Sequence, residues 1–168
     1  NAIGLTGADA GIIRSIKRPV KTVDFGFVGD VEEVNVQVLT TFIQAAITPV
    51  IAPLTYSKEG LLLNTNADTM ASATATGLAT TQSVKLIYCF EKKGVLSNPE
   101  DDDSVIATLN PASYERFKAE GVIYKGMIPK LDNAFEALRK GVEKVIICHA
   151  DELQKAVDGE AGTTITLD

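Results

Sequence analysis

The alternation of short apolar runs with longer segments of helical periodicity constrains the fold of this chain more than any other feature. Apolar runs typical of buried strands lie at 48–54 (TPVIAPL), 85–90 (KLIYCF) and 144–150 (KVIICHA). Helices are predicted at 34–47 and at 66–81, where several alanines favour helical backbone. Strands that alternate with helices usually form a parallel sheet covered by helices on both faces. The sequence therefore predicts an α/β fold with a mainly parallel open sheet.

The other segments fit around this alternation. Residues 11–34 alternate apolar and polar side chains on either side of a central polar stretch, a pattern typical of a β-hairpin. Further predicted elements are strands at 2–5, 61–64 and 163–167 and helices at 112–121, at 151–157 and from Met127 onward. No repeat, low-complexity tract or linker divides the 168 residues, a length typical of one domain.

The charge and hydropathy of the chain exclude some classes of function. A formal net charge of −6 argues against a general nucleic-acid-binding protein, which usually presents a basic surface. The acidic stretch 99–104 (PEDDDS) is predicted to be a solvated turn. No apolar run approaches the roughly 18 residues of a membrane span, and the opening NAIGLTGADA lacks the layout of a signal peptide. The sequence therefore predicts a cytoplasmic protein that associates with neither nucleic acid nor membrane.

The residues most capable of nucleophilic or metal chemistry favour structural roles. Cys89 and Cys148 lie in apolar runs, so both are predicted to be buried, reduced thiols on strands. Neither belongs to a CxxC pair, which argues against a structural zinc site. His149 is the only histidine and has no nearby serine or cysteine nucleophile signature, so a structural or surface role outweighs catalysis.

One lysine lies where a helix disfavours positive charge. Apolar residues recur at helical spacing from Met127 onward, and Pro129 suits a first helical turn. Lys130 therefore lies in that turn, where the partial positive charge of the helix start disfavours a cation by about 0.3–1 kcal/mol. Backbone N–H groups and a lysine at a helix start together make an anion site, especially for phosphate. A bound phosphate would offset this cost; the alternative is a side chain that extends into solvent.

Two further polar segments follow predicted strands, at the edge where open parallel sheets bind ligands. In NTNAD, residues 64–68, Asn66 can cap the following helix and Asp68 lies in its first turn. Asn64 is not needed for capping. EKKGVL, residues 91–96, is either a plain surface turn or one wall of a ligand cleft.

The order of short motifs along the chain resembles that of the acetylglutamate kinases, a branch of the amino acid kinase family. The shared motifs are, in order, GLTGAD, GFVGDVEEVN, TPVIAPL, NTNAD, GVL, GMIPK and GTTI, and they extend through essentially all 168 residues. NTNAD combined with GMIPK is specific. The resemblance implies a three-layer α/β sandwich, the amino acid kinase fold. Residues 1–168 would be its C-terminal, ATP-binding part, with the N-terminal half absent.

The resemblance also implies an activity. Members of this branch transfer the γ-phosphoryl group of ATP to the side-chain carboxylate of N-acetyl-L-glutamate, which gives an acyl phosphate in arginine biosynthesis. A carboxylate nucleophile is already ionised at neutral pH, so no histidine base is needed, and positioning with charge stabilisation can supply catalysis. Mg2+ is expected from phosphoryl transfer chemistry, although no cage of carboxylates is visible and no residue is assigned to a metal.

Individual roles follow from motif position within the resemblance. Lys130 would stabilise the transferring phosphoryl group, Asp68 would orient the lysines, and Asn64 would bind the acylated amino acid. The nucleotide would be bound by Glu91, Lys92, Lys93, Gly94, Val95, Leu96, Val122, Ile123, Tyr124 and Gly126. Family members are commonly dimers or larger, so the full-length protein is expected to be a homo-oligomer.

The chain departs from the family pattern in two ways. Phe90 and Glu91 stand in place of a small hydroxyl residue and an aspartate, and Lys125 replaces a small or acidic residue, which implies altered nucleotide contacts. The family's N-terminal lysine, its glycine-rich phosphate loops and its substrate-binding arginine have no counterpart here. The chain is therefore expected to be a fragment of a longer protein, inactive by itself.

Other functions fit part of the pattern. Much of the acyl pocket would lie in the absent half, so N-succinylglutamate is an alternative substrate. Another amino acid kinase activity, such as that of a glutamate 5-kinase, carbamate kinase or uridylate kinase, is a second alternative, against which the NTNAD motif argues. A noncatalytic nucleotide-binding or regulatory module is the third. The joint presence of Asn64, Asp68 and Lys130 argues against it.

Overall fold

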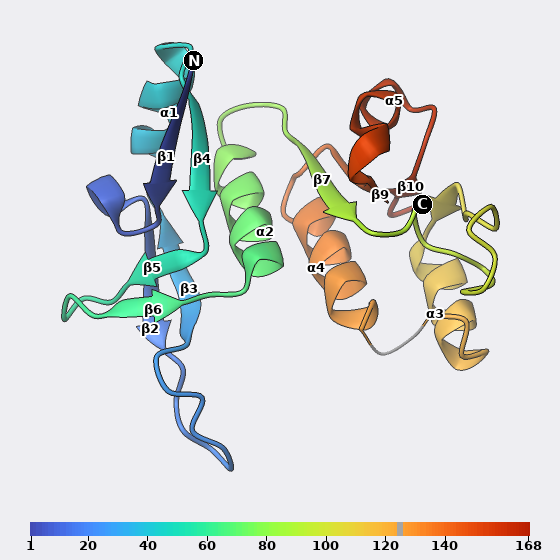
Figure 1. The fold of residues 1–168 in the computed structure, drawn as a ribbon, viewed down its shortest axis with the longest axis horizontal. Coiled ribbons are helices and arrows are strands. Elements are labelled where there is room, and N and C mark those ends of the chain that lie inside the picture. Colours follow the sequence, from blue (N-terminus) through green and yellow to red (C-terminus); the bar gives the residue numbers. More distant parts are fainter. Residues whose placement is uncertain (124–125) are drawn as a thin grey trace. The chain divides into compact units, whose positions relative to one another are not determined.

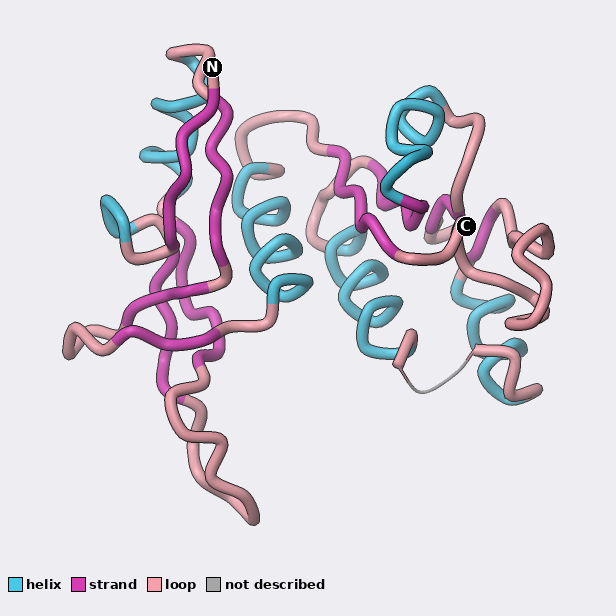
Figure 2. Tube along the Cα trace, in the orientation of Figure 1, coloured by secondary structure: helices cyan, strands magenta, loops and turns pink. Residues whose placement is uncertain are grey.

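The computed structural model describes residues 1–123 and 126–168 and divides the chain into two compact units. The first unit is Asn1–Leu78 and the second is Ala79–Asp168 (Figure 1). Strands and helices occur in both units (Figure 2), as expected of an α/β protein. Tyr124, a predicted nucleotide-binding residue, and Lys125 lie outside the described residues. Within 1–123 and 126–168, no helix is long and apolar enough to cross a bilayer.

A two-stranded parallel sheet begins the first unit. It pairs β1 (Ala2–Thr6) with β4 (Thr48–Ala52), and both strands lie where the sequence predicts them. The connection between them includes helix α1 (Val36–Gln44). Asn35 Oδ1 accepts a hydrogen bond of 3.2 Å from Val38 N–H at the start of this helix. The asparagine thereby satisfies one of the N–H groups that a helix start leaves unpaired.

Four strands form a second, mixed sheet of the first unit, in the order β3-β2-β5-β6. The strands are β2 (Ile13–Lys17), β3 (Gly29–Val34), β5 (Leu54–Tyr56) and β6 (Leu62–Asn64), and the 3-10 helix η1 (Asp9–Gly11) precedes them. β2 and β3 pair antiparallel, which confirms the hairpin predicted over 11–34. β5 and β6 also pair antiparallel, while β2 and β5 are parallel.

Helix α2 (Ala67–Leu78) follows β6 and contacts β3 and α1. A cluster of buried apolar side chains forms the core beneath these elements: Ile12, Ile13, Leu39 and Met70. Leu39 comes from α1 and Met70 from α2, so the cluster joins both helices to the strands. Burial of each such side chain contributes roughly 1.5–3 kcal/mol.

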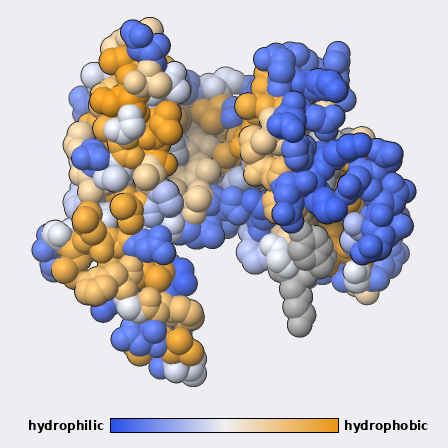
Figure 3. Space-filling view, viewed as in Figure 1, coloured by the Kyte–Doolittle hydropathy of each residue, from blue (hydrophilic) through white to orange (hydrophobic). Residues whose placement is uncertain are grey.

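The loop between β2 and β3 leaves large apolar side chains exposed, namely Val20, Val23, Phe25 and Phe27. Figure 3 shows apolar surface mixed with polar surface over this hairpin. Lys17 Nζ lies 5.2 Å from the ring centre of Phe27, and the Arg18 guanidinium lies 5.6 Å from that of Phe25. Both distances are within the range of cation–π contacts, so the basic side chains cover part of the two rings.

Four strands also form the sheet of the second unit, in the order β7-β9-β10-β8. They are β7 (Lys85–Phe90), β8 (Thr108–Leu109), β9 (Lys144–His149) and β10 (Thr163–Ile165). β7 and β9 run parallel and are paired along their whole length, from Lys85 opposite Lys144 to Phe90 opposite His149. β10 pairs antiparallel with β9 and parallel with β8.

The helices of the second unit are α3 (Pro111–Ala119), α4 (Ile128–Arg139), the 3-10 helix η2 (Ala150–Glu152) and α5 (Leu153–Asp158). Two of them, α4 and α5, pack against β9 of this sheet. α4 buries the side chains of Leu131, Ala134, Phe135 and Ala137. The ring of Tyr114 on α3 has its centre 5.2 Å from that of Phe135, which joins α3 to α4.

The structure differs from the single, mainly parallel sheet that the sequence predicts. Within the described residues the strands form three sheets, two of them mixed. A short connection explains the antiparallel pair β5–β6, where Gly60 has φ +81°, while the longer segment between β9 and β10 contains η2 and α5 and turns into β10 at Gly162, with φ +82°. These left-handed conformations suit glycine and turn the chain back on itself. Strand β8, with two residues, is too short to show a recognisable pattern in the sequence, and β5 begins at Leu54, the last residue of the apolar run that predicts β4.

Candidate functional site

The NTNAD segment joins the end of β6 to the start of α2 in the first unit. Asn66 Oδ1 accepts a hydrogen bond of 3.0 Å from Thr69 N–H, which confirms the predicted helix cap. Asp68 lies in the first turn of α2, where the helix dipole favours a carboxylate. Asn64 is the last residue of β6, and its side chain is exposed. Asn64 is therefore accessible to a ligand and takes no part in capping.

Hydrogen bonds on both sides of Asn64 fix the segment that carries it. Asn64 N–H donates to the carbonyl oxygen of Phe27 at 2.8 Å, and Thr65 N–H donates to that of Pro53 at 3.0 Å. The hydroxyl oxygens of Thr55 and Thr65, both buried, lie 2.9 Å apart and share a hydrogen bond. The strand end therefore presents the Asn64 side chain from a well-supported backbone.

In the second unit, Lys130 lies in the first turn of α4, next to Pro129, as the sequence predicts. Its Nζ is 4.7 Å from the ring centre of Tyr88 and 5.7 Å from that of Phe90, both on β7. The negative faces of these rings attract the ammonium and offset part of the repulsion from the helix start. The structure thus places a cation near the carboxyl end of β7, the edge at which parallel strands present ligand sites.

A cavity of about 290 Å³ beside the end of β7 brings together the two predicted nucleotide-binding segments. The lining residues are Phe90, Glu91, Lys92, Gly94, Val95, Leu96, Pro99, Val122, Ile123 and Met127. Its volume is at the lower end of the range for small-molecule sites, about 300–1,000 Å³, and mostly apolar walls with few polar groups are typical of such sites. Most of EKKGVL therefore lines a cavity, as one of its two interpretations expects, and binding of a ligand there stays a prediction.

Among the described residues that were predicted to bind the nucleotide, two do not line this cavity. Lys93 lines a second hollow of about 300 Å³, together with Lys92 and His149. Gly126 is exposed just before α4. Their part in nucleotide binding stays a prediction.

Two lining residues, Pro99 and Met127, were not predicted from the sequence, and a third, Phe90, was noted there only as a departure from the family pattern. Met127 precedes α4 and is buried, with 4% of its surface exposed. Its sequence position carries a signal, because Met127 begins the apolar periodicity that predicts the helix. Pro99 lies in a polar loop and carries no such signal.

A hydrogen bond to a buried threonine joins the loop 91–96 to β10. Thr163 Oγ1 accepts a hydrogen bond of 2.8 Å from Val95 N–H, and Thr163 has no exposed surface. Gly94 leaves room for this contact, since a Cβ there would lie 2.7 Å from Thr163 Oγ1, closer than real side chains approach. The GVL and GTTI motifs are therefore in direct contact, and Thr163 supports the cavity wall, a role that was not predicted.

Replacing Thr163 by valine is expected to destabilise the protein by about 1–3 kcal/mol, because Val95 N–H loses its buried acceptor while the side-chain volume hardly changes. Urea unfolding followed by circular dichroism measures this change. Thr164→Val is the matched control on the same strand, and it should change the free energy of unfolding by less than about 0.5 kcal/mol. Equal losses in the two variants would contradict the assigned role.

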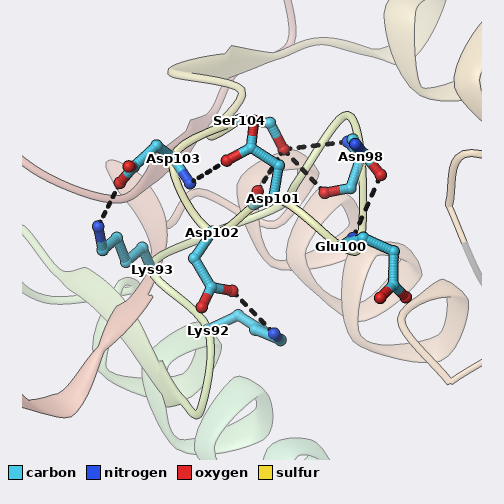
Figure 4. A network of polar contacts seen from close by, with 8 residues as sticks. All are labelled: Lys92, Lys93, Asn98, Glu100, Asp101, Asp102, Asp103 and Ser104. Atoms are coloured by element: carbon cyan, nitrogen blue, oxygen red, sulfur yellow. Dashed lines mark hydrogen bonds and ion pairs between the residues drawn. The ribbon is translucent and has the colours of Figure 1, made fainter.

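Two ion pairs hold the acidic loop 98–104 against the residues that follow β7 (Figure 4). Lys92 Nζ lies 2.8 Å from Asp102 Oδ1, and Lys93 Nζ lies 2.5 Å from Asp103 Oδ1. Further hydrogen bonds link residues within the loop. The turn is exposed to solvent, as predicted, but charge pairs fix the loop that supplies one wall of the cavity.

The ion pair between Lys92 and Asp102 makes this loop sensitive to pH. The hydrogen bond from Lys92, and then its positive charge, lower the pKa of Asp102 below its ordinary value of 3.8. The same contacts raise the pKa of Lys92 above its ordinary value of 10.5. The contribution of Asp102 to stability is therefore complete above pH 3.8 and is lost as the pH falls through the lowered pKa. The contribution of Lys92 is lost only as the pH rises through the raised pKa.

We expect an NMR titration to show this dependence. The amide signals of residues 100–104 should shift as the pH falls below 3.8, when protonation of Asp102 releases Lys92. The amide of Ser113 is the internal control, because it lies in the uncharged capping box that Asn110 forms at the start of α3. Loop signals that move no more than that of Ser113 would contradict the expectation.

Comparison with known proteins assigns the chain to a family. The sequence profile of the amino acid kinase family matches residues 1–149. The chain belongs to the amino acid kinase family. It is 57% identical over 159 residues to the acetylglutamate kinase of Cytophaga hutchinsonii and 54% identical over 165 residues to that of Phocaeicola vulgatus. These alignments cover 94% and 98% of this chain, and 60% and 63% of the two relatives, so the chain spans about 60% of their length.

The fold of this amino acid kinase family member also agrees with a solved structure. The crystal structure of smu.665 from Streptococcus mutans UA159 matches it with a TM-score of 0.75 and 33% sequence identity. The match covers 94% of this chain and 58% of that chain. The predicted α/β amino acid kinase fold is thereby confirmed.

The histidine and cysteines of this amino acid kinase family member lie around the end of β9. His149 Nδ1 accepts a hydrogen bond of 3.2 Å from Asp151 N–H and caps η2, which confirms its structural role. Both cysteines are free, and Cys148 is buried as predicted. The prediction that Cys89 is buried is wrong: its side chain is exposed, on the opposite face of β7 from the buried Leu86 and Tyr88.

Proposed function

We propose that the complete protein is an ATP-dependent kinase that phosphorylates the side-chain carboxylate of N-acetyl-L-glutamate, giving N-acetylglutamyl 5-phosphate in arginine biosynthesis. The observation that carries this proposal is the 54–57% identity to acetylglutamate kinases over nearly the whole chain. The apolar cavity and the position of Lys130 support it independently. The activity is assigned to the whole protein, since the chain spans about 60% of the relatives' length.

The proposed chemistry gives one role to each of three polar side chains. Lys130 stabilises negative charge on the transferring phosphoryl group, because its ammonium lies near a helix start, where phosphates bind. Asp68 orients the lysines of the site, and Asn64 binds the acylated amino acid. The attacking carboxylate is ionised at neutral pH and needs no base. The capping role of His149 agrees with this mechanism.

The cavity of the second unit is the proposed site for the base and ribose of ATP. Val95, Leu96, Val122 and Ile123 supply apolar walls that suit the faces of a purine, and Glu91 and Lys92 supply charged groups. The remaining proposed nucleotide contacts are Lys93, Gly94, Tyr124 and Gly126. Fixed by Thr163 and by the two ion pairs, the loop 91–96 is organised before the nucleotide arrives.

Mg2+ is the proposed metal of the reaction. Within residues 1–123 and 126–168, no group of three or more histidine, cysteine, aspartate or glutamate side chains could hold a metal ion. An ion carried mainly by the nucleotide phosphates and water fits this set of residues. Its chemistry would be to neutralise negative charge on the phosphate oxygens.

The rest of the proposal concerns the architecture and assembly of the whole protein. Residues 1–168 are its C-terminal, ATP-binding part, and an N-terminal half completes the three-layer α/β sandwich. The protein is cytoplasmic and forms a homo-oligomer. Neither nucleic acid nor membrane is a proposed partner, and the net charge of −6 agrees with the first of these statements.

One observation favours a noncatalytic nucleotide-binding module as the second candidate. Phe90 and Glu91 line the cavity where the family usually has a small hydroxyl residue and an aspartate. A site that has lost turnover but kept binding could show such changes. N-succinylglutamate is the alternative substrate, since the described residues do not determine the acyl group.

The test is ADP release by the full-length protein supplied with ATP, Mg2+ and one of three acceptors: N-acetylglutamate, N-succinylglutamate or free glutamate. Turnover with N-acetylglutamate supports the proposal. Turnover only with N-succinylglutamate would mean that the acyl group of the substrate is succinyl. Turnover only with free glutamate would assign the protein to another branch of the family. Nucleotide binding without turnover on any acceptor would identify the noncatalytic module.

A further inference from the structure

Two cysteines lie directly opposite each other at the carboxyl ends of neighbouring strands. The parallel register of β7 and β9 pairs Cys89 with Cys148, one position before Phe90 pairs with His149. Side chains of directly paired residues lie on the same face of a sheet, so the two thiols are neighbours. Neither is part of a disulfide.

The two thiols differ in their access to solvent. Cys148 has no exposed surface and packs with Ile146 and with Ala156 of α5. Cys89 is exposed on the edge strand. Burial raises the pKa of Cys148 to about 11, with further contributions from the charge of Cys89 and a hydrogen bond with it. An oxidant therefore meets Cys89 first, with a protonated thiol beside it.

We propose that Cys89 and Cys148 are a redox-active pair that peroxides convert to an intramolecular disulfide. The Cys89 sulfur attacks an oxygen of hydrogen peroxide, the O–O bond breaks, and Cys89 becomes a sulfenic acid as one water leaves. The Cys148 sulfur then attacks the Cys89 sulfur, the S–O bond breaks, and hydroxide leaves as water with the Cys148 proton. The two thiols lose two electrons, which reduce one peroxide to two waters.

The spacing of paired strands permits this bond and predicts its effect. Neighbouring strands lie about 4.7–4.9 Å apart, within the roughly 4.4–6.8 Å found between the Cα atoms of disulfide-linked residues. Cβ atoms joined by a disulfide are about 3.8 Å apart, closer than the spacing of neighbouring strands, so the bond draws the Cβ atoms of Cys89 and Cys148 toward each other and reorients the residues beside them. Phe90 and Glu91 directly follow Cys89 and line the cavity, so its wall shifts on oxidation.

The effect on activity rests on the proposed function. With ATP bound in this cavity, oxidation lowers kcat/KM for ATP by roughly tenfold or more, since a misplacement of about 1 Å can cost about 10²-fold in rate. Reduction of the disulfide restores the value. The formation of the cross-link itself does not depend on which reaction the protein catalyses.

Peptide mapping of the full-length protein by mass spectrometry tests the redox pair. The protein is reduced, freed of reductant, treated with hydrogen peroxide and digested without reduction. We expect a cross-linked species made of the peptide with Cys89 and the peptide with Cys148. Its mass equals the sum of the two peptide masses less two hydrogen atoms, and it disappears after treatment with dithiothreitol. Cys89→Ser should abolish this species and leave Cys148 reduced. Sulfinic or sulfonic acid at Cys89 without a cross-link, or disulfides formed only between molecules, would overturn the proposal.

Steady-state kinetics before and after oxidation tests the coupling to the cavity. Cys89→Ser should retain its kcat/KM for ATP after peroxide treatment, whereas the unmodified protein should lose it and regain it with dithiothreitol. A cross-link that leaves kcat/KM unchanged would overturn the coupling. Absence of turnover in the reduced protein would count against the kinase, and the peptide map alone would then decide the redox pair.

Discussion

Replacement of Lys130 by alanine in the full-length protein is expected to lower kcat by about 10²–10³-fold, or about 2.7–4 kcal/mol, as for the loss of one oxyanion-stabilising donor. The Lys130 ammonium lies over the rings of Tyr88 and Phe90 at the start of α4. It can stabilise charge on the transferring phosphoryl group in the transition state. Loss of an interaction that is made mainly in the transition state lowers kcat more than it raises KM. Steady-state kinetics with varied ATP measures both constants.

The matched control for this variant is Lys140→Ala, which removes a lysine beyond the other end of the same helix. Lys140 Nζ pairs with Glu136, and both side chains are exposed, so turnover should stay at the level of the unmodified protein. Circular dichroism checks that both variants fold, since Lys130→Ala also loses cation–π contacts worth about 0.5–2 kcal/mol. Equal turnover in the two variants would remove Lys130 from the proposed chemistry.

The features that could be predicted from the sequence are those decided by neighbours along the chain. Lys130 follows Pro129 and an apolar periodicity, so its place in a first helical turn could be predicted from a few residues. Asn66 and Asp68 are further examples, since a cap and a first-turn carboxylate involve only the next helical turn. The strand at 85–90 is a single apolar run. In each case the deciding interactions span only a few positions.

The features that could not be predicted depend on contacts between residues far apart in the sequence. Thr163 supports the cavity only because β10 brings it to Val95. The motif around Lys92 implies a contact with the nucleotide, and only the fold shows that Lys92 also forms an ion pair with Asp102. The exposure of Cys89 depends on which face of β7 the rest of the fold covers, which no local pattern encodes. The family resemblance implied roles for single residues, but it did not imply these pairings.

Replacement of Phe135 by alanine is expected to reduce the free energy of unfolding by about 3–5 kcal/mol, the largest loss of stability among these variants. Phe135 has 2% of its surface exposed and lies on the buried face of α4, beside Leu131 and Ala134. Its ring also contacts Tyr114, whose hydroxyl donates a hydrogen bond of 2.8 Å to Asp132 Oδ1 on α4. Because that hydrogen bond fixes Tyr114, the ring has little freedom to fill the space that Phe135 leaves.

A loss of this size is a large part of the roughly 5–15 kcal/mol that stabilises a typical domain. Urea unfolding followed by circular dichroism measures it, with Glu136→Ala, an exposed neighbour on the same helix, as the control. Phe135→Leu separates the two causes of the loss. It keeps most of the buried volume but removes the aromatic contact, which is worth only about 0.5–1.5 kcal/mol beyond its buried area. If the leucine variant loses as much stability as the alanine variant, the contact with Tyr114 and not the filled volume holds α3 and α4 together, which would contradict the packing argument.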